Sequence, residues 1–254
     1  MKHISLFIIF LLTIGCSIIN LPNNQNSDLI INNLYIINNE QYNSIYIKQN
    51  DDYIQYLILT NNYNGDCLLL RKYILDEPMI YNHENKTNKS YYENSYIDLY
   101  LNNEFFDKFS DTLKKQIVET NITITTKDSL GIGGNTTMNI KRKIFILSYT
   151  EVCGIESSSR PTEGKALNYF NTNESRIAKN EQNNIDSWWL RTPVTGSSLV
   201  VCAIGNNGII GHSAILDYKG EVVNGVRPAF CLPRDTPISV GEVNGEKAYF
   251  IADE

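Results

Sequence analysis

Short apolar runs, many of them alternating with polar residues, recur along the whole chain. Alternation places successive side chains on opposite faces of an extended strand, so each run predicts a β-strand. The predicted strands cover residues 29–37, 44–48, 53–60, 67–74, 121–126, 143–147, 199–204, 214–218, 225–232 and 247–251. Asn64-Gly65 separates two of these runs, and this dipeptide favours a two-residue hairpin turn. We therefore expect antiparallel hairpins.

Helices are predicted at fewer places. Residues 96–109 carry apolar side chains at mixed spacings, which predicts a helix with an irregular end. Ser110 can cap a second short helix over 111–118. Ser148 and Glu151 form the capping-box pattern that starts a third.

The stretch from 154 to 186 is polar and favours a mobile surface loop, with a helical piece expected at 163–170. Together these elements predict one α+β domain over residues 29–254. Its body would be mainly antiparallel, twisted sheets with two or three short helices packed against them.

The two tryptophans of the chain are adjacent, in the segment SWWLRTP (187–193). In an extended strand Trp188 and Leu190 would face one way, and Trp189 and Arg191 the other. A buried indole is a large core anchor. Arg191 could stack on Trp189 as a cation–π pair.

A second segment, NGVRPAF (224–230), follows about thirty residues later. Pro228 has no N–H to donate, so this strand is expected at a sheet edge or beside a bulge. We interpret both segments as core strands of one sheet, in which Arg191 and Arg227 bind carboxylates or loop carbonyls. The alternative is that one of these arginines contacts a ligand. The structural signature of the two segments comprises Trp188, Trp189, Arg191, Gly225, Arg227 and Pro228.

SWWLRTP followed by NGVRPAF resembles the closing signature of a bacterial and phage family, the domain of unknown function 6273. That family typically reads WWLRSPG and then NGVRPAL, so Thr192 and Val194 depart from its pattern. Upstream segments agree in order, and the resemblance extends over residues 44–232. The ending also resembles, more weakly, the C-type-lectin-like and sulfatase-modifying folds, which implies a fold and no activity.

The net charge of the chain makes some classes of partner unfavourable. Hydrophobic residues make up 42% of the chain, enough for a substantial core, while the formal net charge is −6. Negative charge disfavours nucleic acid and anionic lipid surfaces as partners.

The N-terminus has the pattern of a secretory signal over residues 1–16: a basic start, an apolar run and Gly15 before Cys16. Residues 12–16 resemble a bacterial lipobox, although Thr13 replaces the usual Leu. The resemblance implies lipidation of Cys16, followed by a polar tether over 17–28. The alternative is an ordinary cleaved signal in which Cys16 has no role. We expect an extracytoplasmic protein, lipid-anchored in the bacterial cell envelope.

Four further cysteines follow: Cys67, Cys153, Cys202 and Cys231. Outside the cytosol they could form two disulfides. Cys202 with Cys231 is the preferred pair, because both lie on predicted strands of the same stretch; free buried thiols are the alternative. Neither Cys nor His has the spacing of a metal site, so no metal and no cofactor is predicted.

Turn-forming polar residues cluster between 193 and 225, where loops on a rigid scaffold favour binding. The candidate ligand-binding residues are Ser197, Ser198, Asn206, Asn207, His212, Asp217 and Tyr218. No catalytic residue is assigned. The favoured function is a non-enzymatic binding module for a carbohydrate or protein ligand. The alternatives are an envelope-glycan hydrolase that uses His212 or a carboxylate near Trp188, and a purely structural envelope lipoprotein.

Overall fold

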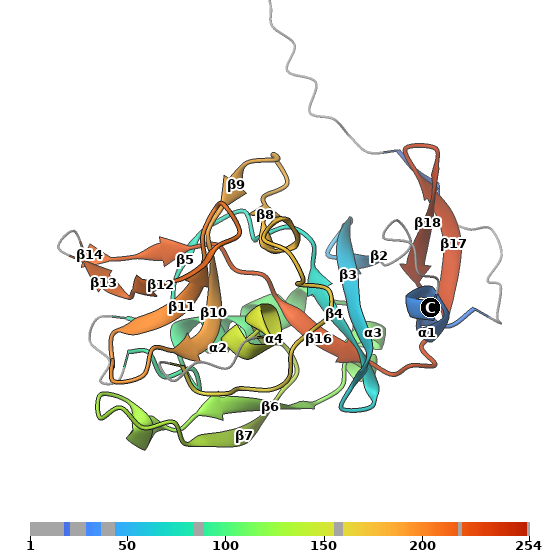
Figure 1. The fold of residues 1–254 in the computed structure, drawn as a ribbon. Coiled ribbons are helices and arrows are strands. Elements are labelled where there is room, and N and C mark those ends of the chain that lie inside the picture. Colours follow the sequence, from blue (N-terminus) through green and yellow to red (C-terminus); the bar gives the residue numbers. More distant parts are fainter. Residues whose placement is uncertain are drawn as a thin grey trace, which may run out of the picture.

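A seven-stranded sheet crosses the middle of the computed structural model and extends to one side of it (Figure 1). The structure describes residues 18–20, 29–36, 44–83, 89–154, 160–217 and 220–252. In spatial order the strands are β1 (Ile19–Asn20), β17 (Ile238–Val243), β18 (Glu246–Ile251), β2 (Ser44–Gln49), β3 (Asp52–Tyr63), β4 (Asp66–Arg71) and β16 (Ala229–Leu232). Neighbouring strands are antiparallel except β18 and β2, which are parallel.

Several predicted strands are confirmed in this sheet. Those at 44–48, 53–60, 67–74 and 247–251 are β2, β3, β4 and β18. The predicted hairpin turn joins β3 to β4, with Asn64 at φ 55°, a left-handed conformation that asparagine tolerates.

A three-stranded sheet and four two-stranded ribbons complete the strands of the described residues. The three-stranded sheet consists of β10 (Trp188–Pro193), β11 (Val200–Ile204) and β12 (Ile210–Ala214). The ribbons pair β6 (Thr120–Thr125) with β7 (Thr137–Arg142), β5 (Met79–Ile80) with β15 (Val223–Asn224), β8 (Ala178–Lys179) with β9 (Ile185–Asp186), and β13 (Leu216–Asp217) with β14 (Gly220–Glu221). The architecture is therefore α+β with mainly antiparallel sheets, as predicted.

The prediction that SWWLRTP and NGVRPAF form strands of one sheet is wrong. β10 belongs to the three-stranded sheet, and β16 lies at the edge of the seven-stranded sheet. The two segments touch at Gly225, which donates to the Ser187 carbonyl at 2.8 Å and accepts from the Trp189 N–H at 3.0 Å. A Cβ on Gly225 would lie 2.9 Å from the Ser187 oxygen, so this approach requires glycine. Pro228 precedes the edge strand β16, in agreement with its missing N–H.

The helices are short: α1 (Ile31–Ile36), α2 (Tyr96–Tyr100), α3 (Asp111–Gln116) and α4 (Tyr149–Cys153). The irregular end predicted for 96–109 is a π-helical turn followed by a 3-10 turn. Both predicted caps are confirmed: the Ser110 hydroxyl accepts from the Leu113 N–H, and Ser148 and Glu151 form a capping box.

Three other predictions from the sequence are wrong. Residues 29–37 contain the helix α1 rather than a strand, because Ile31 and Leu34 bury the same face at helical spacing. Residues 144–147 are buried as predicted, but they join the sheet through the single bridge between Phe145 and Ala229. The backbone at 163–170 forms no helix, since Glu163 is held inside the protein by side chains from other elements.

The described residues include part of the predicted tether. Ile19 and Asn20 pair with Val243 and Glu242 of β17, so these two residues form a strand rather than a spacer. The predicted signal, Cys16 and Tyr218 lie outside the described residues. In the part of the chain that the structure describes, no helix is long and apolar enough to cross a membrane.

One face of the seven-stranded sheet carries the core. The Tyr56 ring of β3 meets Phe230 of β16 with 5.2 Å between centroids, and Phe230 meets Phe109 at 5.4 Å. Alternate residues of β2 and β3 point to the opposite face, where, among the described α-helices, only α1 contributes a residue, Tyr35, to the cavity that lies there.

The preferred disulfide is not formed. Cys67, Cys153, Cys202 and Cys231 are all free thiols. Cys202 lies on β11 and Cys231 on β16, two strands of different sheets. Burial raises the pKa of each of these two thiols to about 12.

Candidate functional site

Arg191 is the centre of a buried charge cluster, the Arg191 cluster, which also contains Glu151 and Glu163. All three side chains are fully buried. The guanidinium of Arg191 donates to both oxygens of Glu151, each at 2.8 Å, while its Nε lies 3.7 Å from Glu163 Oε2. It also donates to the carbonyls of Thr123 and Ile146. The cluster therefore joins β10, α4 and β6.

Glu163 completes this cluster from the loop that was expected to be mobile. Its carboxylate accepts from the backbone N–H and hydroxyl of Thr125 and from the hydroxyl of Thr192, each at 2.7 Å. Burial raises the pKa of Glu163, although Arg191 and the hydrogen bonds oppose that shift. Two carboxylates face one guanidinium, so the cluster is balanced when Glu163 holds a proton.

Arg227 is the second buried arginine. It donates to the carbonyls of Arg71 and Lys72, and its guanidinium carbon lies 5.0 Å from the centre of the Trp188 ring. Burial lowers its pKa to about 10. The expectation of carbonyl and carboxylate partners for the two arginines is confirmed. The stacking of Arg191 on Trp189 is replaced by contact with Phe145, at 5.9 Å.

Both tryptophans are fully buried, and both indole N–H groups donate to carbonyls, Trp188 to Arg176 and Trp189 to Met79. The signature side chains thus lie inside the protein, and their polar atoms bond to the protein itself, except for Arg227 Nη1, which has no hydrogen-bond partner among the described residues. They hold segments together and offer no surface to a ligand.

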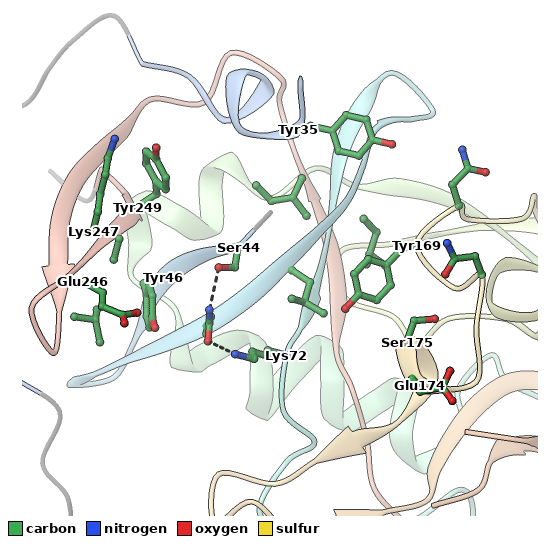
Figure 2. Close-up of a pocket in the computed structure, with 18 of the residues that line it drawn as sticks. Tyr35, Ser44, Tyr46, Lys72, Tyr169, Glu174, Ser175, Glu246, Lys247 and Tyr249 are labelled. Carbon is green, nitrogen blue, oxygen red and sulfur yellow. Dashed lines mark hydrogen bonds between the residues drawn. The ribbon is translucent and has the colours of Figure 1, made fainter. Parts of the chain in front are cut away.

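The uncovered face of the seven-stranded sheet holds a cavity of about 910 Å³, which we name the tyrosine groove (Figure 2). Its floor is β2 and β3, one wall is the β17–β18 hairpin, and the other wall is the loop 168–175. α1 contributes at one end. The tyrosines of the lining are Tyr35, Tyr46, Tyr169 and Tyr249.

Strand pairing explains the floor of the groove. Ser44 pairs with Leu57 and Tyr46 with Gln55, so these four side chains share one face of the sheet. The residues between them face the core; Ile45, for example, is fully buried.

A short chain of hydrogen bonds crosses the floor (Figure 2). Gln55 Nε2 donates to Ser44 Oγ at 2.9 Å, and Lys72 Nζ donates to Gln55 Oε1 at 2.8 Å. These bonds fix the orientation of the amide. An ammonium group has three N–H donors, so Lys72 has donors to spare for a ligand.

The loop wall is supported from outside by the β11–β12 hairpin tip. A Cβ on Gly208, which has φ +73°, would lie 1.9 Å from the Asn173 carbonyl oxygen. Only glycine fits this contact. Glu174, the next residue of the wall, has its pKa lowered by hydrogen bonds from its own backbone N–H and from Thr172.

Four of the predicted ligand-binding residues lie at two opposite ends of the three-stranded sheet. Ser197 and Ser198 lie in the β10–β11 connection, where their carbonyls accept from Ser90. Asn206 and Asn207 are exposed at the other end of β11, a distance of about 17 Å for five strand residues.

Of the remaining candidates, the backbone of His212 and Asp217 lies on strands rather than in these loops. His212 pairs with Cys202 in the middle of β12, and Asp217 lies on β13; the side chains of His212 and Asp217 are outside the described part of the structure. None of the described candidates lines the tyrosine groove.

Sequence reasoning missed the groove because its lining comes from segments far apart in the chain. The available signal was local: the run Ser44-Ile45-Tyr46-Ile47 places a hydroxyl and a phenol on the polar face of a strand. Nothing in the sequence links that face to Tyr169 or Tyr249.

A second hollow, of about 670 Å³, lies beside β5 and α2. His83 borders it, with Nδ1 3.6 Å from a Glu221 oxygen and its ring 4.8 Å from that of Tyr96. Among the described residues no group of three His, Cys, Asp or Glu side chains could hold a metal ion.

The described part of the protein is an α+β scaffold that contains a buried charge cluster, the Arg191 cluster, and an open groove, the tyrosine groove. A family model, "Domain of unknown function (DUF6273)", matches residues 64–234, and the chain belongs to that family. Neither the curated proteins nor the solved structures contain a match to this chain.

The family match and the groove cover different parts of the molecule. The Arg191 cluster lies entirely within residues 64–234, apart from the Tyr63 hydroxyl that donates to Glu151 at 2.5 Å. The floor and the hairpin wall of the groove, by contrast, come from residues before 64 and after 234. Only Lys72 and the loop wall come from the matched region.

Proposed function

We propose that this protein is a non-enzymatic binding module that takes its ligand in the tyrosine groove. The observation that carries the proposal is the groove itself: a cavity of about 910 Å³ that combines four tyrosine rings with a few fixed polar groups. Binding sites for small ligands have this size and this mixture of aromatic and polar lining.

The position of the groove supports binding rather than a structural role. The side chains that hold the fold together are buried and paired internally, whereas Tyr35, Tyr46 and Tyr169 are half-buried at an open surface. Tyrosine is favoured in such places, since one side of its ring packs and its hydroxyl stays available.

The environment of Glu174 argues against this carboxyl as the proton donor of a hydrolase. An envelope-glycan hydrolase needs one carboxyl group with a raised pKa to protonate the leaving group. Hydrogen bonds lower the pKa of Glu174, so its carboxyl group does not meet this requirement.

The direct test is a printed array of glycans, peptides and envelope proteins probed with the chain from residue 17 onward. We expect capture of at least one class of ligand, lost in Tyr46→Ala and Tyr169→Ala and retained in Tyr100→Ala. Tyr100 is a matched control because it is also half-buried but lines the second hollow. Capture that survives both groove substitutions would refute the proposal, and capture of nothing would favour the structural alternative.

We also propose that Cys16 anchors the protein through a lipid to the outer side of the membrane, with the binding domain extracytoplasmic. The lipobox-like residues 12–16 support this address. In cells labelled with a fatty-acid analogue, the wild-type protein should carry label and sediment with membranes. Cys16→Ser should lose both properties; membrane association without label would contradict the anchor.

A further inference from the structure

The tyrosine rings of the groove are held in place before any ligand arrives. Tyr46 stacks on Phe250 with 5.5 Å between centroids, and Tyr169 packs edge-on against Phe170 at 5.1 Å. Figure 2 shows Tyr46 and Tyr249 on the hairpin side, with Tyr35 and Tyr169 across the cavity. Tyrosine rings on both sides of the cavity are therefore already fixed. They offer flat apolar faces to a ligand, and binding does not cost further side-chain entropy.

The polar groups between these rings are hydroxyls and amides that can both donate and accept. The lining contains the amides Gln55, Asn168 and Asn171 and the hydroxyls Ser44, Thr172 and Ser175. Asn168 and Asn171 are exposed, and their amides make no hydrogen bond to another described residue. A ligand rich in hydroxyl groups, each a donor and an acceptor, matches this set.

The charges of the lining cancel. Two cations, Lys72 and Lys247, stand against two anions, Glu174 and Glu246. A strongly charged ligand would be attracted by the two residues of opposite charge and repelled by the two of like charge. The groove therefore fits an uncharged ligand.

The floor of the groove offers no free strand edge. β3 pairs with β2 and β4 along its two sides, and β2 pairs with β3 over its whole length and with β18 at Tyr46, so both floor strands have a neighbour on each side. An extended peptide that binds by strand addition needs an open edge. A sugar needs none, because it binds through hydroxyl groups and through C–H faces that pack on aromatic rings.

We infer that the ligand of the tyrosine groove is an uncharged oligosaccharide. The inference rests on the proposed function and adds the chemical class of the ligand. Sugar rings would pack on Tyr46 and Tyr169 while their hydroxyls bond Gln55 and the amides of the loop wall. A cavity of about 910 Å³ accommodates a short oligomer rather than a single ring.

The test is isothermal titration calorimetry of the chain from residue 17 onward. The probes are four neutral oligosaccharides (of β-1,4-glucose, α-1,4-glucose, β-1,4-xylose and N-acetylglucosamine), oligogalacturonate as the anionic counterpart, and a pool of unstructured peptides. At least one neutral oligosaccharide should bind, and Tyr46→Ala and Tyr169→Ala should each weaken it by about tenfold or more.

Two further variants sharpen the result. Gln55→Leu keeps the side-chain volume but removes the amide, and should weaken binding of the same sugar by about fivefold to tenfold. Tyr100→Ala in the second hollow should bind as the wild type does. Thermal melting of each variant shows that the fold is retained.

The outcomes separate the ligand class from the site. Tight binding of oligogalacturonate or of peptides, lost in Tyr46→Ala, would overturn the inference and leave the proposed function standing. Sugar binding that is lost in Tyr100→Ala and kept in Tyr46→Ala would overturn both. Failure of every neutral oligosaccharide to bind the wild-type chain would overturn the inference.

Discussion

The Arg191 cluster and the tyrosine groove are both built from segments distant in sequence, yet they differ in almost every physical respect. In the cluster three ionisable side chains are fully buried and are satisfied by one another and by the hydroxyl and backbone groups around them. In the groove the polar groups lie at an open surface, and several keep unused donors and acceptors. A family signature therefore marks what holds this fold together, while the candidate site lies largely in the flanking segments.

Energetics explain why the two regions can be separated experimentally. Removing one member of a buried ion pair leaves its partner charged and without compensation in a medium of low dielectric constant. Removing a half-buried ring leaves a surface that water can cover. Substitutions in the cluster should therefore act on the free energy of unfolding, and substitutions in the groove on affinity.

The largest effect is expected for Arg191→Met. The substitution leaves Glu151 and Glu163 buried without a cation, and should lower the free energy of unfolding by about 3–5 kcal/mol. Urea denaturation measures the loss. Arg234→Ala is the control, since the Arg234 side chain is exposed and, among the described residues, its guanidinium donates only to the Asn32 side chain; the variant should stay within about 0.5 kcal/mol of the wild type. Equal effects of the two variants would show that the cluster does not hold the scaffold.

Gly208→Ala should have the next largest effect, because Gly208 is where the β11–β12 hairpin tip meets the loop wall of the groove. The added Cβ would collide with the backbone of Asn173 and displace the loop wall, at a cost of about 1–3 kcal/mol. Affinity for a groove ligand should fall with it.

Gly131→Ala is the matched control for that collision. Gly131 lies outside the groove and has a similar φ, +77°, but no atom lies within 4 Å of the added Cβ. The variant should show the backbone strain alone and bind as the wild type does. If both variants lose affinity equally, the contact with Asn173 does not position the wall.

Glu163→Gln should alter the pH dependence of stability more than its magnitude. The folded protein raises the pKa of Glu163 above its usual 4.5, so folding favours the protonated form. The stabilisation is complete below pH 4.5 and is lost as the pH rises through the folded pKa. The glutamine stays neutral, so the difference in unfolding free energy between the variant and the wild type should grow with pH.

Denaturation curves at pH 4.5, 6 and 8 measure this difference. Glu104→Gln, at an exposed position, should leave the pH profile unchanged. A Glu163→Gln profile parallel to that of the wild type would mean that Glu163 is ionised in the folded protein throughout.

Tyr169→Ala should have the smallest effect on stability, below about 1 kcal/mol, although it removes a ring from the groove. Tyr56→Ala is the comparison, since Tyr56 lies on β3 but faces the core and is fully buried. That substitution should cost about 3–5 kcal/mol in the same urea assay. A large loss for Tyr169→Ala would place its ring in the scaffold instead.

The sequence predicted those parts of the fold that depend on neighbouring residues. Alternation located β2, β3 and β4, and the caps at Ser110 and Ser148 depend on a residue three positions away. Ile31 and Leu34 stand three positions apart, a helical spacing, and the burial of both on one face explains why 29–37 contains the helix α1 and not the predicted strand.

The cluster and the groove could not be predicted in the same way. Arg191 was expected to bind a carboxylate, but Glu151 lies 40 residues from it and Glu163 belongs to a polar stretch that resembles a surface loop. Only the closed fold brings them together. The groove requires the pairing of β18 with β2, a parallel contact between the two ends of the chain that no local pattern encodes.

The pairing of β1 with β17 would limit the distance between the domain and a membrane if the proposed lipid anchor is present. Ile19 is fixed to Val243, on the same hairpin that forms one wall of the groove. If Cys16 carries the lipid, three residues remain to reach that strand, and a fully extended chain spans about 10 Å over that length. The hairpin wall of the groove would then start within about 10 Å of the headgroup layer, a position suited to polymers that lie along the envelope.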